Sequence, residues 1–227
     1  MYENCFKRII DFCCALLALI VLSPFLIIFT ILGAVFMGGN PFFTQPRPGK
    51  DEKIFNLIKF RTMDNRRGAD GELLPDEVRL NQYGKFLRST SVDELPELIN
   101  ILKGDMAVIG PRPQLVRDMV FMSPGQRRRH SVRPGLSGLA QVNGRNVITW
   151  EDKLSWDLKY IEKITFLSDV KIILETFGKV FKRADINREG TASDMDFGDY
   201  LLEKGVVGRK EYEKKQVEAK ELLRRRG

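Results

Sequence analysis

Two adjacent acidic side chains, Asp93 and Glu94, stand at the start of a predicted helix in the segment 88–96 (RSTSVDELP). Neighbouring carboxylates can supply a nucleophile, a metal ligand or a group that transfers protons. Successive helical residues point about 100° apart, so we expect the two groups to take different roles. The alternative is structural, because Ser91 and Glu94 match the S-x-x-E capping box and Asp93 suits the helix dipole.

A second candidate is a cation on a stiff backbone, Arg112, which lies between Pro111 and Pro113 after a predicted strand. Because proline restricts the backbone, the guanidinium loses little further entropy when it binds. Its rigid, always charged fork of donors is suited to a phosphate or a pyrophosphate. The simpler alternative is a surface turn in which Arg112 forms a salt bridge.

Glycines dominate the segment 133–138 (RPGLSG), which leads into the turn-rich segment 143–146 (NGRN). Glycine lets backbone N–H groups come close to an anion, and Arg133 and Arg145 would add positive charge. The sequence contains neither a P-loop nor a G-x-G-x-x-G motif, so the usual nucleotide-binding motifs are absent. Taken alone, this segment is weak evidence for an anion site, and it is informative only together with the other candidate segments.

Single charged residues complete the candidates. Lys59 and Arg61 place positive charge at the end of a predicted strand. Asp157 and Asp169 are lone acids on predicted amphipathic helices, where an ordinary ion pair is the default interpretation. We interpret the basic run 127–130 (RRRH) as solvated or lipid-facing surface, with a structural histidine.

The composition excludes several kinds of site. The chain has 227 residues and a formal net charge of +7, a surplus that fits anionic lipid headgroups, phosphate-bearing substrates or nucleic acid. Its three cysteines all lie between positions 5 and 14, and its one histidine is His130. This distribution excludes a disulfide framework and a cysteine-ligated zinc site, and it disfavours a histidine-based triad.

A long apolar run, residues 12–39, is the stretch that is able to enter a bilayer. It is too long for a signal peptide and lacks a small-x-small cleavage site. A straight helix over it would be about 40 Å long, more than the hydrocarbon core requires. Pro24 cannot donate a hydrogen bond to Ile20, which predicts a kink, and Ser23 can bond a freed carbonyl one turn back.

Charges on both sides of this run predict how it sits. Lys7 and Arg8 precede it, and Arg47, Lys50 and Lys53 follow it. A tilted span, which is the alternative, would place one cluster on the translocated side, against the positive-inside tendency. We therefore expect a re-entrant helix–break–helix with both ends on the cytoplasmic face, each half reaching about 18 Å, or one leaflet.

The rest of the chain is predicted to be mostly helical with scattered short strands, an α/β-associated domain and not a regular βαβ series. The patterns predict helices at 76–88, 92–103, 114–122, 124–131, 150–163, 168–183 and 208–226, and strands at 42–45, 54–61 and 106–110. The expected organisation is a re-entrant membrane element at 1–40, one compact cytoplasmic catalytic domain at 41–190, and a polar linker with a charged helix at 191–227.

In this order, the pieces resemble the bacterial sugar transferase family, the monotopic phosphoglycosyl transferases. The resemblance covers roughly residues 1–190 and rests on the segments 59–63 (KFRTM), 88–100 (RSTSVDELPELIN), 104–106 (GDM), 110–113 (GPRP), 133–138 and 141–145 (QVNGR). The chain is similar to the short form, with only the catalytic core, and especially to enzymes that begin N-linked glycan assembly on undecaprenyl phosphate. Val92 departs from the leucine often found there, and nothing after Gly190 matches the family pattern.

The resemblance implies an enzyme that gives the sugar 1-phosphate of a UDP-sugar to a polyprenyl phosphate and releases UMP. It implies that Asp93 attacks the β-phosphorus and carries a phosphosugar ester before the lipid phosphate displaces it. Mg²⁺, held by Asp93 and Glu94, would neutralise charge, and Glu94 would handle the proton of the lipid phosphate or complete the metal shell. A membrane helix broken at Ser23 and Pro24 is also implied.

The resemblance further implies residues that bind or support the substrates, with Arg88, Arg112 and Arg145 holding phosphates: Lys59, Arg61, Thr62, Arg88, Arg112, Arg133, Arg145, Asp157 and Asp169. The expected partners are a UDP-sugar donor, a polyprenyl phosphate acceptor and the lipid of a bacterial inner membrane, without nucleic acid. The resemblance favours acetamido sugars such as a diacetylated bacillosamine as donor, although no residue in the sequence identifies the sugar.

Two alternatives stay open. One is a non-enzymatic, membrane-tethered basic adaptor, and the other is a related lipid-phosphate hydrolase that uses the same acids. Nucleic-acid readers usually interleave aromatic with basic residues or carry a helix-turn-helix, and neither pattern is found. The predicted helix at 208–226 has a thin apolar stripe at Tyr212, Val217, Leu222 and Leu223, for which we expect a partner or self-association ahead of lipid contact.

Overall fold

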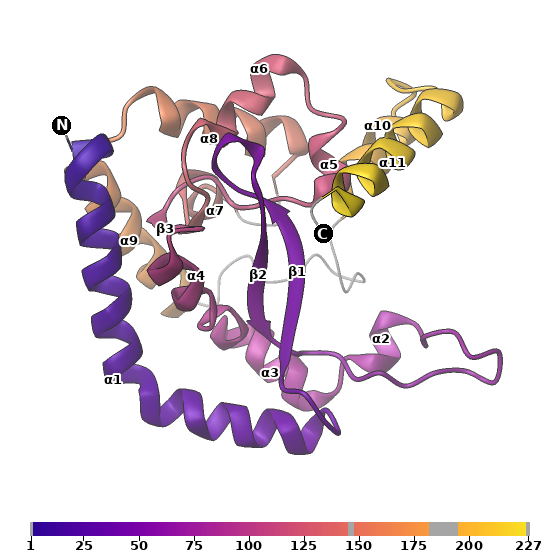
Figure 1. Ribbon diagram of the computed structural model, residues 1–227, viewed down its shortest axis with the longest axis horizontal. Coiled ribbons are helices and arrows are strands. Elements are labelled where there is room, and N and C mark those ends of the chain that lie inside the picture. Colours follow the sequence, from indigo (N-terminus) through magenta and orange to yellow (C-terminus); the bar gives the residue numbers. More distant parts are fainter. Residues whose placement is uncertain (1, 145–147, 182–194, 226–227) are drawn as a thin grey trace.

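Helices make up most of the chain and surround two small two-stranded sheets in the part that the structure describes (Figure 1). The computed structural model describes residues 2–144, 148–181 and 195–225. The prediction of a mostly helical chain with short strands is confirmed.

The elements follow one another as listed here in chain order: a short π-helix Tyr2–Phe6, α1 Lys7–Phe36, β1 Phe42–Pro48, a 3₁₀ turn Lys50–Glu52, β2 Ile54–Phe60, α2 Asp76–Arg79, α3 Gln82–Thr90, the 3₁₀ turn η3 Val92–Glu94, α4 Glu97–Lys103, β3 Ala107–Ile109, α5 Val116–Met119, α6 Pro124–Arg127, the 3₁₀ turn η4 Arg128–Ser131, β4 Gly135–Ser137, α7 Leu139–Val142, α8 Trp150–Glu162, α9 Phe166–Phe181, α10 Phe197–Glu203 and α11 Arg209–Arg224.

The first sheet is a long antiparallel ribbon of β1 and β2, in which Phe42 faces Phe60 and Pro48 faces Ile54. The second is a short parallel pair, β3 with β4, in which Ile109 faces Ser137. The strand predictions at 54–61 and 106–110 are confirmed, and β1 continues beyond the predicted 42–45. β4 lies in a segment that was predicted only as a glycine-rich loop.

Helix α1 has 30 residues and contains Pro24. It bends about midway along its length (Figure 1). The Ser23 hydroxyl donates to the carbonyl of Ile20 at 2.8 Å, as expected for a side chain that satisfies a carbonyl near a proline. Among the described residues, α1 is the one helix that is long and apolar enough to cross a membrane by length and composition.

Both halves of α1 pack against the rest of the molecule. Near its start, Lys7 Nζ lies 2.6 Å from Asp169 Oδ2. Near its end, the Tyr83 hydroxyl donates to Phe29 O at 2.9 Å, and the Tyr83 ring stacks on Phe36 with centroids 5.1 Å apart. The two ends of α1 are therefore anchored to the same body.

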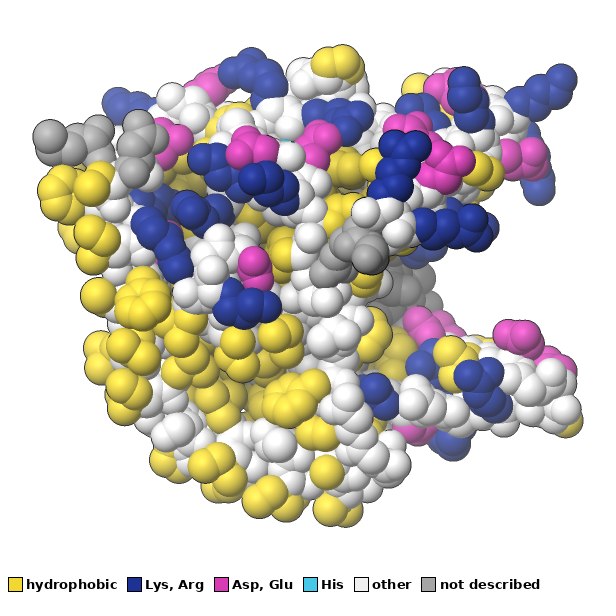
Figure 2. Space-filling view, in the orientation of Figure 1, with side chains coloured by type: hydrophobic (Ala, Val, Ile, Leu, Met, Phe, Trp, Pro, Cys, Tyr) yellow, Lys and Arg dark blue, Asp and Glu magenta, His cyan; other side chains and the backbone are white. Residues whose placement is uncertain are grey.

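The outer face of α1 is exposed and apolar, and it forms a hydrophobic band along the left and lower edges of the molecule (Figure 2). Leu17 is 64% exposed and Val35 is 71% exposed. Exposed apolar side chains on α9 include Phe166, Leu167, Leu174 and Phe177. An apolar surface of this kind needs a partner other than water, and a lipid phase fits it best.

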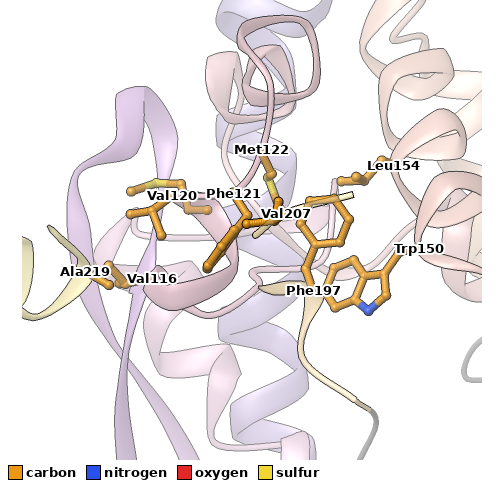
Figure 3. Close-up of a cluster of buried hydrophobic side chains, with 10 residues drawn as sticks. Val116, Val120, Phe121, Met122, Trp150, Leu154, Phe197, Val207 and Ala219 are labelled. Atoms are coloured by element: carbon orange, nitrogen blue, oxygen red, sulfur yellow. The ribbon is translucent and has the colours of Figure 1, made fainter. Parts of the chain in front are cut away.

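Helices α10 and α11 complete a hydrophobic core. Phe197, Val207 and Ala219 are buried with residues of α5 and α8, including Val116 and Trp150 (Figure 3). The predicted helix at 208–226 is confirmed as α11, but the interpretation of the preceding stretch as linker only is wrong at 197–203, which forms α10. The predicted linker from 191 to 194 and the proposed boundary at 190 lie outside the described residues.

The helix predicted over 76–88 is interrupted. Leu80 has ψ 87°, and the Asn81 side chain accepts a hydrogen bond from Gly84 N, so a new helix, α3, starts there. The helix predicted over 92–103 is divided into η3 and α4 with Pro96 between them. Local capping and proline override the average helical pattern at both places.

Candidate active site

The two adjacent acids lie in a tight turn between two helices. Ser91 adopts a left-handed conformation with φ 56°, which ends α3 and starts η3. Its side chain makes no capping hydrogen bond, and Glu94 points to other partners. The capping-box alternative is therefore wrong, and the side chains of Asp93 and Glu94 are available for contacts outside the turn.

Glu94 is the centre of a charged cluster. Its Oε1 lies 2.8 Å from Lys59 Nζ and 2.5 Å from Arg112 Nη2. The side chains are 20% exposed for Glu94, 18% for Lys59 and 39% for Arg112, so the cluster is reachable from the surface. Burial alone would raise the pKa of Glu94, but Arg112 and Lys59 outweigh it and hold that pKa well below its usual range.

Asp93 differs from its neighbour in its bonded partners and in the direction of its pKa shift. It is partly buried, and it forms no hydrogen bond or ion pair within the described part of the chain. Burial, reinforced by the Glu94 charge, raises the pKa of Asp93 to about 6. The expectation that the two acids take different roles agrees with this contrast: Glu94 is bound by two cations, and Asp93 is a carboxylate without a bonded partner.

A third acid joins the cluster from the first turn of α4. Glu97 is 2% exposed, and its Oε1 lies 3.1 Å from Lys59 Nζ. Burial raises its pKa to about 7 despite the Lys59 charge. The sequence interpretation missed Glu97 as a site residue, because its partner lies on β2 and no local pattern links the two positions.

The turn that carries Arg112 is held by three separate elements. Gly135 N donates to Pro111 O at 3.0 Å, and Arg129 Nη2 donates to Arg112 O at 2.6 Å. Arg47 of β1 donates to Pro113 O at 3.2 Å. Each carbonyl of the Pro-Arg-Pro turn thus has a donor, which supports the prediction of a stiff backbone. Arg47 and Arg129 were not identified from the sequence as contributors to the site.

Three of the predicted binding residues lie next to this cluster. Arg88 Nε donates to the Thr62 hydroxyl at 3.1 Å, and the Asp93 charge acts on Arg88. Arg61 follows Lys59 at the end of β2 and donates to Phe42 O at 3.4 Å. Lys59 therefore contacts Glu94 directly, Arg88 acts on Asp93 through its charge, Thr62 contacts Arg88, and Arg61 contacts β1. Arg145 lies outside the described residues.

Backbone packing accounts for the glycines of the segment 133–138. Gly110 N donates to Ser137 O at 2.9 Å, and Gly135 N donates to Pro111 O. A Cβ at Gly135 would lie 2.1 Å from Gly110 N, and one at Gly138 would lie 2.1 Å from Gly110 O. These glycines are required for the close approach of two backbones, and anion binding by this segment stays a prediction.

Arg133 also has a different location from the one expected. Its Nε donates to Gly104 O at 2.8 Å, at the C-terminal end of α4. It lines a cavity of about 220 Å³ with Lys7, Arg8 and Asp11 of α1. Arg133 thus lies beside the start of the membrane helix, and its contacts do not include the Glu94 cluster.

The two lone acids are buried in structural contacts. Asp157 is 2% exposed and pairs with Arg129 Nη2 at 2.6 Å. Asp169 is 4% exposed and accepts from Lys7, Tyr2 and Tyr160. The default interpretation of an ion pair describes both acids in the structure, which supports a positioning role, and their predicted substrate binding stays a prediction.

The fit of the expected Mg²⁺ can be judged from the acids present. No group of three or more acidic, histidine or cysteine side chains in residues 2–144, 148–181 and 195–225 could enclose a metal ion. Mg²⁺ usually binds through one or two carboxylates and completes its shell with water and substrate phosphates. Asp93, partly buried and without a bonded partner, fits that mode, and Glu94 would have to exchange a cationic partner to join it.

Comparison with known proteins agrees with these motifs. The model of the family described as bacterial sugar transferase matches residues 2–183. EpsL of Bacillus subtilis, an uncharacterized sugar transferase, is 46% identical over 175 residues, which are 77% of this chain and 86% of that protein. ExoY of Sinorhizobium fredii, an exopolysaccharide production protein, is 32% identical over 77% of this chain and 84% of its own length.

Longer relatives match as well. The UDP-glucose:undecaprenyl-phosphate glucose-1-phosphate transferase of Klebsiella pneumoniae is 38% identical over 78% of this chain, and the match covers 40% of that protein. The resemblance found from the sequence motifs is thereby confirmed, and an enzyme is favoured over a non-enzymatic adaptor. With its cluster of acids and cations on β2, η3 and the Pro-Arg-Pro turn, the chain belongs to the bacterial sugar transferase family.

Proposed function

We propose that this chain transfers a sugar 1-phosphate from a UDP-sugar to a polyprenyl phosphate and releases UMP. The observation that carries the proposal is the contrast between Asp93, which has no bonded partner among the described residues, and Glu94, which is bound by Lys59 and Arg112. Relatives named as UDP-glucose:undecaprenyl-phosphate glucose-1-phosphate transferase, undecaprenyl-phosphate galactose phosphotransferase and UDP-galactose-lipid carrier transferase support the same class of substrates.

In the first step, an Asp93 oxygen attacks the β-phosphorus of the donor. The bond between that phosphorus and the oxygen of the α-phosphate breaks, and UMP leaves with the electron pair. The sugar 1-phosphate is then esterified to Asp93 as an acyl phosphate, which keeps a high transfer potential. Ionised Asp93 is required, and with a pKa of about 6 it is mostly ionised at neutral pH.

Cations in the site would bind the phosphates during this step. Arg112 is the most exposed member of the cluster and has a fixed backbone, so its guanidinium can turn from Glu94 to a diphosphate oxygen at low entropic cost. Lys59 is more buried and is held by Glu94 and Glu97, so it supplies fixed positive charge. When bound, Mg²⁺ would neutralise further charge on the diphosphate.

In the second step, an oxygen of the polyprenyl phosphate attacks the same phosphorus, and the bond from phosphorus to the Asp93 oxygen breaks. Glu94 is a poor proton acceptor while two cations hold it. Once Arg112 binds a substrate phosphate, Glu94 loses one of these cations and its affinity for a proton rises. Glu94 can then take a proton from the lipid phosphate, if that phosphate arrives protonated.

The membrane element fits access to a lipid acceptor. Both ends of α1 are anchored to the catalytic body, Lys7 through Asp169 and Phe36 through Tyr83. A helix that crossed the bilayer would separate these two ends by the thickness of the membrane. We therefore propose a re-entrant α1 that is bent near Ser23 and Pro24, with the catalytic part on the cytoplasmic face of a bacterial inner membrane.

The donor sugar is proposed on resemblance alone to be a UDP-acetamido sugar. Glucose and galactose, named for several relatives, are the competing donors. A test would incubate the purified chain with Mg²⁺, polyprenyl phosphate and a panel of UDP-sugars, and would measure UMP together with the lipid product. If the enzyme instead cleaves the donor for many turnovers without the acceptor lipid, a hydrolase is favoured.

The covalent step has its own test. Donor labelled in the β-phosphate is mixed with enzyme without acceptor, quenched within milliseconds and digested for mass spectrometry. The expected result is label on the peptide that contains Asp93, with release of one UMP per protein molecule. UMP formation that always requires the acceptor, with no label on the protein, would replace this route by direct transfer.

A further inference from the structure

The C-terminal segment, residues 195–225, lies beyond the part of the chain that matches the sugar transferase family and is nevertheless built into the fold. Trp150 Nε1 donates to Met195 O at 3.0 Å, and the Trp150 and Phe197 rings lie 5.0 Å apart (Figure 3). From α11, Lys215 Nζ donates to Val120 O at 2.6 Å. The segment is thus attached to α8 and to the end of α5.

One buried carboxylate connects this segment to the stretch that follows Arg112. Asp118 is 2% exposed and uses both of its oxygens. Its Oδ2 accepts from Leu115 N at 3.0 Å, two residues after Pro113, and its Oδ1 accepts from Phe197 N at 2.9 Å. The start of α10 is therefore joined through a single side chain to the end of the Pro-Arg-Pro turn.

The Pro-Arg-Pro turn is also held by Arg47 of β1. Its guanidinium donates to Pro113 O at 3.2 Å and to Gln45 Oε1 at 2.7 Å, and its Nε is buried without a partner. Burial, together with repulsion from Arg112, lowers the pKa of Arg47 to about 10, while Asp118 and Asp196 are among the acids that oppose this. Asp196 also forms an ion pair with Arg117 of α5.

We propose that the C-terminal segment positions Arg112 for phosphate binding: the Asp196–Arg117 ion pair and the hydrogen bond from Phe197 N to Asp118 hold the start of α10 on α5, and Asp118 in turn holds Leu115 N just after the Pro-Arg-Pro turn. This rests on the proposed function, in which Arg112 leaves Glu94 for the donor diphosphate. Without the Asp196–Arg117 ion pair, the start of α10 would loosen on α5, and Asp118 would lose its fixed partner at Phe197 N and hold Leu115 N less firmly. The backbone of Arg112 would then be free to move, and part of the donor affinity would be spent on ordering it.

The test compares variants of the full-length chain in lipid. Asp196→Asn is expected to raise the donor KM about fivefold, with a smaller effect on kcat, because donor binding must now order the turn. Asp196→Glu keeps the charge and should return the KM to within about twofold. Glu203→Gln, on the exposed side of the same helix α10, is the matched control and should behave as the wild type.

A double-mutant cycle tests the route through Arg117. If Asp196 acts through its ion pair with Arg117, then Asp196→Asn should have no further effect on KM in an Arg117→Met background. Additive effects would overturn the proposal, and so would an Asp196→Asn variant that melts at a lower temperature but keeps its KM. If Arg117→Met does not fold, Arg117→Gln replaces it, since glutamine removes the charge and keeps a polar side chain at this half-exposed position.

Hydrogen exchange separates this inference from the proposed function. Peptides that span residues 110–118 should exchange faster in Asp196→Asn than in Glu203→Gln, whether or not a donor has been found. Unchanged exchange in that segment would overturn the positioning role. If exchange rises as expected but the wild type releases UMP from no donor, the proposed function fails while the mechanical link between the C-terminal segment and Arg112 stands.

Discussion

Two arginine–carboxylate pairs are linked by the backbone carbonyl of Arg112 and differ in how far their side chains are exposed. Arg129 pairs with Asp157, and Arg112 pairs with Glu94, while Arg129 Nη2 donates to the carbonyl of Arg112. The side chains of the first pair are 1% and 2% exposed, and those of the second are 39% and 20% exposed. The chemistry of the partners is the same, but only the second pair can be reached by a substrate.

The surroundings differ as much as the exposure. Arg129 directs Nε and Nη2 to Asp157 Oδ2, so one acid serves one cation. Around Arg112 there are three acids, Asp93, Glu94 and Glu97, for two close cations, and their pKa values are moved in opposite directions. Neighbouring acids with divergent pKa values in a reachable cluster indicate catalysis, whereas a sealed pair indicates support.

The largest expected effect is at Asp93, which belongs to neither pair. Asp93→Asn should lower turnover by about 10³-fold or more, because an amide cannot serve as the nucleophile. The melting temperature should stay close to that of the wild type, since Asp93 makes no bonded contact within the described residues. UMP release and thermal unfolding measure the two quantities. Turnover near the wild-type rate would remove Asp93 from the nucleophile role.

Exchanging each arginine for methionine sharpens the comparison. Arg129→Met leaves Asp157 buried without its cation and should cost about 3–5 kcal/mol of unfolding free energy. Arg112→Met leaves Glu94 paired with Lys59, so the stability should change by about 1 kcal/mol or less while donor turnover falls by about 10²-fold or more. Urea unfolding and UMP release are the measurements. Equal losses of stability in the two variants would mean that both ion pairs are structural.

Glu97 tests whether a buried member of the reachable cluster acts on the chemistry. With a pKa of about 7, it is close to half protonated at neutral pH, so Glu97→Gln should change stability by about 1 kcal/mol or less. Turnover should fall by about tenfold, because Lys59 loses one of its two anchors. Glu77→Gln, an exposed acid on α2, is the control. If Glu97→Gln leaves turnover unchanged, Glu97 has a structural role like that of the Arg129–Asp157 pair.

The smallest effect on turnover is expected at His130, which lies beside Arg129 and acts on the pH dependence of stability. Burial, with the nearby Arg129 charge, lowers the pKa of His130 to about 4. Between about pH 4 and 6.5, the imidazole of His130 therefore binds a proton more readily in the unfolded chain than in the folded one. The contribution of neutral His130 to stability is full above about pH 6.5 and is lost as the pH falls toward 4. Replacing it in His130→Gln should flatten that part of the stability profile by about 1–3 kcal/mol. Urea unfolding from pH 4 to 7 provides the measurement, and an unchanged slope would contradict the assignment.

Helices at the two ends of the chain show why the fold was only partly predictable. The apolar character of α1 and the proline in it are local properties, so an apolar helix with a bend and the Ser23 hydrogen bond were expected from the sequence. The helix nevertheless begins at Lys7, before the predicted residue 12, and continues through Pro24 where a break was predicted. The apolar stripe of α11 was predicted to meet a partner. Tyr212 and Leu222 instead pack on the chain's own core, while Val217 is 55% exposed. A stripe does not specify its partner, so self-association through α11 stays untested.

At the site, sequence alone identified the residues whose chemistry is local: the adjacent acids Asp93 and Glu94, the Arg112 held between prolines, and the order of motifs that defines the family. The tertiary structure decided which acid is paired and which is not, brought Glu97 to Lys59, and assigned the glycines to backbone packing. The physical reason is that side-chain type and backbone stiffness are properties of the residue itself. Exposure, pKa and ion pairing depend on neighbours that are distant in the sequence and meet only in the fold.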